Sequence, residues 1–130
     1  MSSLTRIKDL INNQISDGRN RMPAVVNSGV ETYPQNGIVL FYTNDQVDNE
    51  ILALGRKTKI GLYSQGVQIA IMHERYDTCR DIAFQVLEFI NVNMPTGITM
   101  TPQGAPSYAG INGQRGQHIY TIDYQMKGDK

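Results

Sequence analysis

The sequence contains one cysteine, no tryptophan and no excess of charge of either sign. Twelve Lys and Arg residues balance twelve Asp and Glu residues, so the formal net charge is zero. A domain that coats DNA or RNA normally carries a clear basic excess, and so does a protein that adsorbs to an anionic membrane. The charge balance therefore argues against both kinds of binding surface.

The single Cys79 cannot form an internal disulfide and cannot build a zinc site alone. No apolar run approaches the length that spans a bilayer. Near the N-terminus, Arg6, Lys8 and Asp9 interrupt the apolar pattern, which is unlike the uninterrupted apolar core of a signal peptide. These features predict a soluble protein made in a reducing cytoplasm, with no metal and no cofactor.

What the sequence does contain is enough apolar residues for one packed core. Apolar residues make up 40% of the chain and charged residues 18%, which is too little charge for a disordered protein. A chain of 130 residues has room for a single core. We therefore expect one domain over residues 1–130.

Two segments have apolar residues at the three- and four-residue spacing of an amphipathic helix. The first covers residues 3–17, with Ser3 as its N-cap and Gly18 at its end. The second starts at Asp77 or Thr78. The residues expected on the buried stripe of the second helix are Cys79, Ile82, Ala83, Val86, Leu87 and Ile90.

Other segments have the composition or alternation of strands. Residues 37–43 form a continuous apolar run, so this strand should be buried on both faces, with Phe41 in the core. The alternating or short strand candidates are residues 24–26, 67–73, 97–101 and 118–126. Two helices and several strands predict an α+β fold, a two-layer sandwich in which both amphipathic helices cover one face of a mixed, mainly antiparallel sheet.

Two long segments lack a clear pattern, and long loops in compact domains are usually functional. We expect residues 44–65 to form a loop with a short strand at 60–63. Residues 102–116 contain two prolines and four glycines, which predicts a segment too flexible to hold a strand. This glycine-rich segment does not end in the Gly-Lys-Ser/Thr of a phosphate-binding loop, so a mobile hairpin loop is the better interpretation.

Catalytic and metal-binding patterns have little support in the sequence. A Cys–His nucleophile would have to combine Cys79 with His73 or His118, but Cys79 falls on the apolar stripe of the second helix. The acidic residues of the 44–65 segment lack the glycine and the later glutamate of a calcium loop. We therefore expect no enzymatic activity.

The segment GVQIAIMHERYDTCRDIA, residues 66–83, resembles the strand-then-helix core of phage tail terminator proteins, which are also called tail completion or minor capsid proteins. The opening helix, the buried strand at 37–43 and the late aromatic strand at 118–126 stand in the same order as in that family. The similarity in sequence, as distinct from the order of elements, is confined to residues 66–91.

The resemblance implies a structural virion protein of long-tailed phages that forms a hexameric ring from its own copies. Such a ring caps the tail tube, ends tube polymerisation and presents a surface to the head-side connector or neck protein. It would be assembled in the host cytoplasm and reside at the junction of tail and head. It would also surround the DNA conduit, where contact with DNA in the lumen would be passive, and it would not bind a membrane.

Two alternatives stay open at this point. One is a head-closure or neck adaptor protein of similar size, and the other is a small ligand-binding or enzymatic α+β domain. The candidate partner-contact residues are the basic ones in the two long segments, which are Arg56, Lys57, Lys59 and Arg115. The balanced net charge favours contact with acidic groups on a tube subunit over contact with DNA phosphates.

Overall fold

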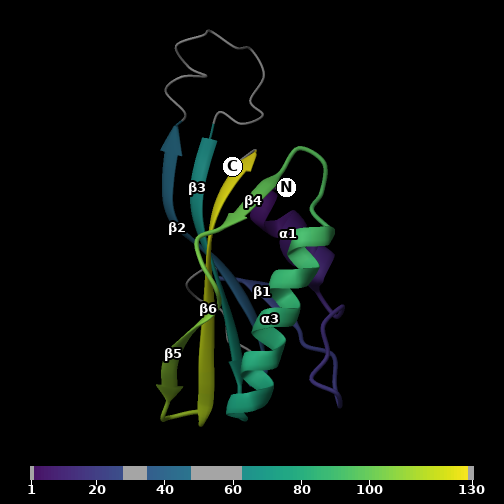
Figure 1. Ribbon diagram of the computed structural model, residues 1–130, viewed down its shortest axis with the longest axis vertical. Coiled ribbons are helices and arrows are strands. Elements are labelled where there is room, and N and C mark those ends of the chain that lie inside the picture. The colour runs from purple at the N-terminus through teal and green to yellow at the C-terminus, as the bar shows by residue number, and fades with distance from the viewer. Residues whose placement is uncertain (1, 28–34, 48–62, 129–130) are drawn as a thin grey trace, which may run out of the picture.

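The computed structural model describes residues 2–27, 35–47 and 63–128. In chain order the elements are α1 (Ser3–Ile11), β1 (Ala24–Val26), β2 (Gly37–Val47), β3 (Tyr63–His73), α3 (Tyr76–Val92), β4 (Thr99–Pro102), β5 (Ser107–Asn112) and β6 (Gln117–Gly128). The predicted α+β sandwich is confirmed: two helices cover one face of a six-stranded mixed sheet (Figure 1).

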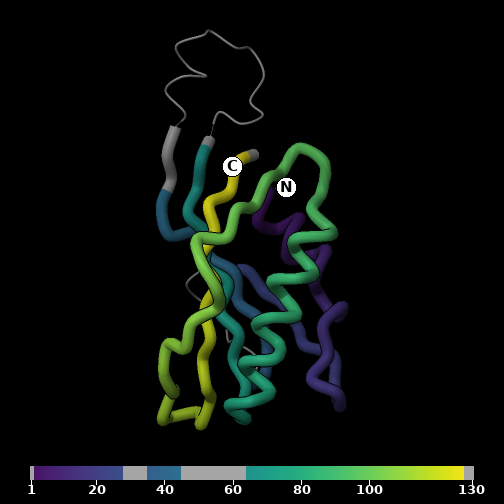
Figure 2. Tube along the Cα trace, in the orientation of Figure 1, coloured from purple at the N-terminus to yellow at the C-terminus, as the bar shows by residue number. Residues whose placement is uncertain are grey.

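The strand order is β1-β2-β3-β6-β4, and β5 also pairs with β6. β1 runs parallel to β2, and every other described pairing is antiparallel. β6 is the central strand of the C-terminal half, because β3 lies along one of its edges while β4 and β5 share the other edge. The β5–β6 hairpin and the start of α3 lie at one end of the sheet, and the end of β2 and the start of β3 lie at the other (Figure 2).

The core lies between the helices and the sheet face that they cover. Alternation places Val67, Ile69 and Ile71 of β3 on that face, and all three are buried as predicted. The second helix buries its predicted stripe, with Leu87 only partly covered. The largest fully buried apolar side chains of this core are Leu4, Ile7, Ile11, Met22, Ile38, Leu40, Ile69, Ile71, Ile82, Ile122 and Met126.

The first helix is shorter than predicted and starts with a different cap. Ser2, not Ser3, is the N-cap, and its hydroxyl accepts a hydrogen bond from the Thr5 amide. The helix ends at Ile11 because Asn12 turns to extended backbone, and its side-chain oxygen accepts a hydrogen bond from Ala24 N–H at 2.9 Å. Gly18 therefore does not end the helix as predicted. The Asn12 side chain, which bonds to the first residue of β1, ends the helix although the apolar spacing continues beyond it.

The second helix begins at Tyr76, slightly before the predicted start. Arg75 occupies the N-cap position without a side-chain capping bond, and Asp77 lies inside the first turn. The helix therefore follows β3 almost directly, and its orientation is set by the packing of its apolar stripe on the sheet.

The apolar run in β2 is buried on both faces only in part. Val39, on the face away from the helices, is 1% exposed, whereas Phe41 on the same face is half-buried. The prediction that Phe41 belongs to the core is wrong, because strand alternation directs Leu40 toward the helices and Phe41 away from them.

Both long segments contain more strand than predicted. Residues 44–47 extend β2 and residues 63–65 extend β3, and the two strands pair on either side of a register shift between Tyr42 and Asn44. Most of the predicted short strand at 60–63 lies outside the described residues. The 102–116 segment contains β5, so the prediction that it holds no strand is wrong. The glycine inside β5, Gly110, lies in a β-bulge: it has a φ of +116° at the register shift in the β5–β6 pairing.

Candidate functional site

Four aromatic rings gather at the end of the sheet formed by the β5–β6 hairpin and the start of α3. We call Tyr76, Tyr108, His118 and Tyr120 the aromatic cluster. Tyr108 of β5 lies directly opposite Tyr120 of β6, and His118 is two residues earlier on the same face of β6. Tyr76 is the first residue of α3 and closes the group from the helix layer.

The rings of the aromatic cluster contact one another in edge-on and tilted geometries. The centroid of Tyr76 lies 5.2 Å from that of Tyr108, 5.7 Å from that of His118 and 5.8 Å from that of Tyr120. These separations fall in the range at which aromatic pairs attract, about 4.5–7 Å. The cluster therefore links α3, β5 and β6 into one continuous surface.

Hydrogen bonds fix the polar ends of the same rings. The Tyr120 hydroxyl donates to the Tyr76 hydroxyl at 2.9 Å, and this bond, followed by burial, raises the pKa of Tyr120. The Tyr108 hydroxyl and His118 Nδ1 share a second bond of 2.9 Å. Each ring is thus held by contacts at both its face and its tip.

A large part of this surface remains exposed. Tyr76 is 46% exposed, Tyr108 is 44% exposed, and Ile111, which lies opposite His118 at the hairpin, is 58% exposed. Clustered and exposed tyrosines next to an exposed aliphatic residue are typical of protein–protein contact surfaces, where Tyr is enriched among the residues that contribute most to binding. The arrangement is suited to contact with another protein.

Cys79 lies beneath the aromatic cluster and does not form a nucleophilic pair with a histidine. Its thiol is fully buried and lies 3.3 Å from the Ile71 carbonyl oxygen and 3.4 Å from the His118 carbonyl oxygen. Burial raises the pKa of Cys79 to about 11, which keeps the group protonated near neutral pH. The thiol contacts the His118 backbone, while the His118 ring faces Tyr108.

Of the four predicted partner-contact residues, the structure describes Arg115 alone. Arg56, Lys57 and Lys59 lie outside the described residues. Arg115 lies in the turn between β5 and β6, where its carbonyl oxygen accepts a hydrogen bond from Gln35 Nε2 at 2.9 Å. The hairpin that contains Arg115 is at the opposite end of the sheet from Val47 and Tyr63, the described residues that flank the 48–62 segment (Figure 1).

Within the described residues, no three His, Cys, Asp or Glu side chains gather as a metal site would require. Neither described helix is long and apolar enough to cross a bilayer. In comparisons with known proteins, no family model and no curated protein matches the chain.

Sequence reasoning missed the aromatic cluster because it missed β5. The alternation of residues 118–126 correctly placed Tyr120 on the inner face, but Tyr108 was assigned to a flexible loop. The signal that could have found the cluster is the short run Ser-Tyr-Ala before Gly110, which a β-bulge allows to continue as a strand.

Proposed function

We propose that this protein is a tail terminator, a structural virion protein that caps the phage tail tube as a ring of its own copies. The ring ends tube polymerisation and presents the surface at which the tail joins the head-side connector. The protein acts through contact surfaces on different sides of one domain and has no catalytic role.

The exposed aromatic cluster is the observation that carries the proposal. A capping protein needs a rigid, partly apolar surface that another protein can cover, and Tyr76, Tyr108 and Ile111 provide one at the hairpin end of the sheet. The resemblance of residues 66–83 to tail terminators supplies the class of partner. The direct passage from β3 into α3, with β6 paired beside β3, is consistent with that resemblance.

In this proposal the aromatic cluster is a protein-contact surface of the capping ring, and its rings are held by contacts within the chain before any partner binds. A preorganised contact loses little side-chain entropy on association. Truncation of a tyrosine at the centre of such a contact typically costs about 2 kcal/mol or more of binding energy.

The test is to add the purified protein to polymerising tail tube protein and to measure tube length by electron microscopy. The unaltered protein should give tubes of limited length with a ring at one end. Tyr108→Ala should give overlong tubes, whereas Tyr108→Phe, which keeps the ring and loses only the hydroxyl, should still cap.

Unlimited tube growth in the presence of the unaltered protein would contradict the terminator role. Binding to head connectors without any effect on tube length would favour a neck adaptor instead. Light scattering of the isolated protein and of the capped tubes would give the number of copies in the ring.

A further inference from the structure

Asparagine is followed by glycine at two places in the sequence, Asn36-Gly37 and Asn112-Gly113. In such a pair the backbone nitrogen of the glycine can attack the side-chain amide carbon of the asparagine, because a glycine has no side chain to shield its nitrogen. Ammonia leaves as a five-membered succinimide ring closes. The two pairs have the same chemistry, so a difference between their rates has to come from their surroundings in the fold.

The Asn112-Gly113 pair lies where β5 passes into the turn that leads to β6 (Figure 1). Asn112 is the last residue of β5, and Gly113 is exposed. The Asn112 Oδ1 atom accepts a hydrogen bond from the Gln114 amide at 3.2 Å. Because this bond spans Gly113, it holds the Asn112 side chain against the Gly113 peptide unit. The Gln114 N–H also stabilises negative charge on Oδ1, which is the atom that becomes an oxyanion during the attack.

The turn has room for the reaction. No heavy atom lies within 4 Å of an ideal Cβ at Gly113, so the space on that side of the glycine is open. The Arg115 amide donates to the Asn112 carbonyl oxygen at 3.2 Å, which closes the turn through Asn112 and Arg115 and leaves Gly113 between them. Asn112 and Gly113 can therefore react without the loss of a strand pairing inside the core.

The Asn36-Gly37 pair is held differently. The Asn36 Oδ1 atom accepts a hydrogen bond from the Glu74 amide at 3.1 Å, which directs this side chain to a segment far away in the sequence. Gly37 is buried, and as the first residue of β2 it pairs with Met72 of β3. Attack by the Gly37 nitrogen would require the start of β2 to leave the sheet, and such local opening has a free-energy cost.

We propose that Asn112-Gly113 is a self-modifying site, at which the side-chain amide of Asn112 is converted to an acid without an enzyme. A bond forms between Asn112 Cγ and the Gly113 nitrogen while the bond from Cγ to Nδ2 breaks, and the Gly113 amide proton leaves with the ammonia. Water then opens the succinimide, adding its hydroxyl to one of the two carbonyl carbons and its proton to the nitrogen. One opening gives an aspartate, and the other gives an isoaspartate, whose main chain passes through the former side chain.

Both products change the hairpin beside an exposed apolar side chain, because Ile111 is 58% exposed and directly precedes Asn112. Either product adds one negative charge to a chain in which twelve basic residues balance twelve acidic ones. Isoaspartate also adds one methylene group to the main chain of the turn. The site is defined by chemistry within the chain and does not depend on the tail terminator assignment.

The test is to incubate the folded protein at mildly alkaline pH and to follow both asparagines by peptide mapping and mass spectrometry. Trypsin cleaves after Arg56 and Arg80, so the two pairs fall on different peptides. Asn112 should convert at least about 10-fold faster than Asn36, since Asn36 reacts only after local opening of the strand. In denaturant at the same pH, the two rates should become similar.

Two variants make the assignment specific. Gly113→Ala shields the attacking nitrogen and should fold normally, because its added Cβ meets nothing within 4 Å, so the acidic product at Asn112 should be lost. Gln114→Ala is the matched control in the same turn. It removes an exposed side chain but keeps the backbone N–H that bonds to Asn112, so conversion should continue. Asn112→Asp marks the position of the charged product on an anion-exchange column.

Several results would overturn the proposal. Equal rates at Asn112 and Asn36 in the folded protein would show that the turn gives Asn112 no advantage. Conversion of Asn112 in denaturant but not in the folded protein would show that the turn protects it. Undiminished acidic product in Gly113→Ala would mean that water, and not the Gly113 nitrogen, attacks the Asn112 amide.

Discussion

His73 Nε2 donates a hydrogen bond to Asp17 Oδ2 over 2.9 Å, and both side chains are more than nine-tenths buried. His73 Nδ1 accepts from the Arg75 amide, so the ring proton lies on Nε2. The other oxygen of Asp17 accepts from the amides of Arg19 and Asn20. This pair fastens the turn after α1 to the end of β3, which are far apart in the sequence.

The Asp17 carboxylate should make stability depend on pH in the acid range. Hydrogen bonds from the Asn20 amide, then from His73 and the Arg19 amide, lower the pKa of Asp17 from 3.8 to about 2. Because the pKa is lower in the folded state, the contribution to stability is present above about pH 4 and is lost as the pH falls toward 2. Asp17→Asn should therefore be less stable than the unaltered protein near neutral pH.

The measurement is denaturant unfolding of both proteins at several pH values. The difference in free energy of unfolding should stay constant above about pH 4 and shrink as the pH approaches 2. A difference that is the same at both ends of this range would show that the charge of Asp17 contributes nothing to the fold.

Ile82 lies at the centre of the contact between α3 and the sheet and is 1% exposed. Ile82→Ala should lower the free energy of unfolding by about 2–5 kcal/mol, since the truncation removes buried methyl groups and leaves a cavity. Gln85→Ala, on the exposed face of the same helix, should change it by less than about 0.5 kcal/mol. A loss below about 1 kcal/mol for Ile82→Ala, measured by denaturant titration, would mean that α3 does not pack as described.

A side chain at Gly66 of β3 would displace two neighbouring side chains and disturb a hydrogen bond between β2 and β3. A Cβ there would meet the Thr43 hydroxyl and would lie 2.6 Å from Asn44 Oδ1, the same atom that accepts a hydrogen bond from the Gly66 amide. Gly66→Ala should lower stability by about 1–3 kcal/mol, the usual cost of overpacking. Gly113→Ala is the control, because nothing lies within 4 Å of its added Cβ. Equal melting temperatures of the two variants would contradict the close approach of β2 and β3 at this point.

Cys79 should react slowly with thiol reagents in the folded protein. Its side chain is fully buried, so a reagent cannot reach the sulfur. Its pKa is raised to about 11, so almost no reactive thiolate is present near neutral pH. Labelling should be far slower than in the unfolded chain, and Cys79→Ala should retain tube capping. Rapid native labelling accompanied by loss of capping would restore a functional role for this thiol.

The basic residues Arg56, Lys57 and Lys59 give a prediction that rests on the sequence alone. Reversing all three to Glu should leave the circular dichroism spectrum unchanged but abolish capping, seen as overlong tubes, if they pair with acidic groups on a tube subunit. A variant with Arg19→Glu and Arg21→Glu, both exposed on the turn after α1, is the control and should still cap. Normal tube length in the triple variant would exclude Arg56, Lys57 and Lys59 from the contact.

Helices and strands with a regular spacing of apolar residues were predictable from the sequence. The elements that were predicted wrongly, the end of the first helix and β5, depend on local features that this spacing does not reveal. The strand at 67–73, the stripe of the second helix and the inner face of the strand at 118–126 were predicted from apolar spacing and are observed. The first helix was predicted too long because periodicity does not reveal that Asn12 will bond to Ala24 N–H, a residue in another element. β5 was missed because a glycine in a bulge cannot be distinguished from a glycine in a loop by composition.

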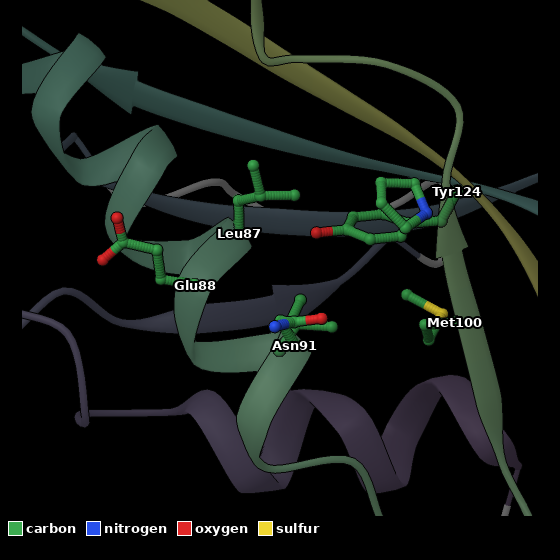
Figure 3. A pocket seen from close by; sticks show the side chains of 7 residues that line it. Leu87, Glu88, Asn91, Met100 and Tyr124 are labelled. Carbon is green, nitrogen blue, oxygen red and sulfur yellow. The ribbon is translucent and has the colours of Figure 1, made fainter.

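The sequence by itself determined which residues leave water, and with them the fold class. Apolar residues at helical and strand periods can be buried together in only a few layer arrangements, so the two-layer sandwich followed from spacing alone. Tertiary structure alone decided where the surface features lie. The aromatic cluster joins Tyr76, Tyr108 and Tyr120 from three elements. The pocket between Leu87 of α3, Met100 of β4 and Tyr124 of β6 likewise draws its lining from three elements (Figure 3). Contacts between residues so distant in the chain depend on strand order and register, which the apolar pattern does not encode.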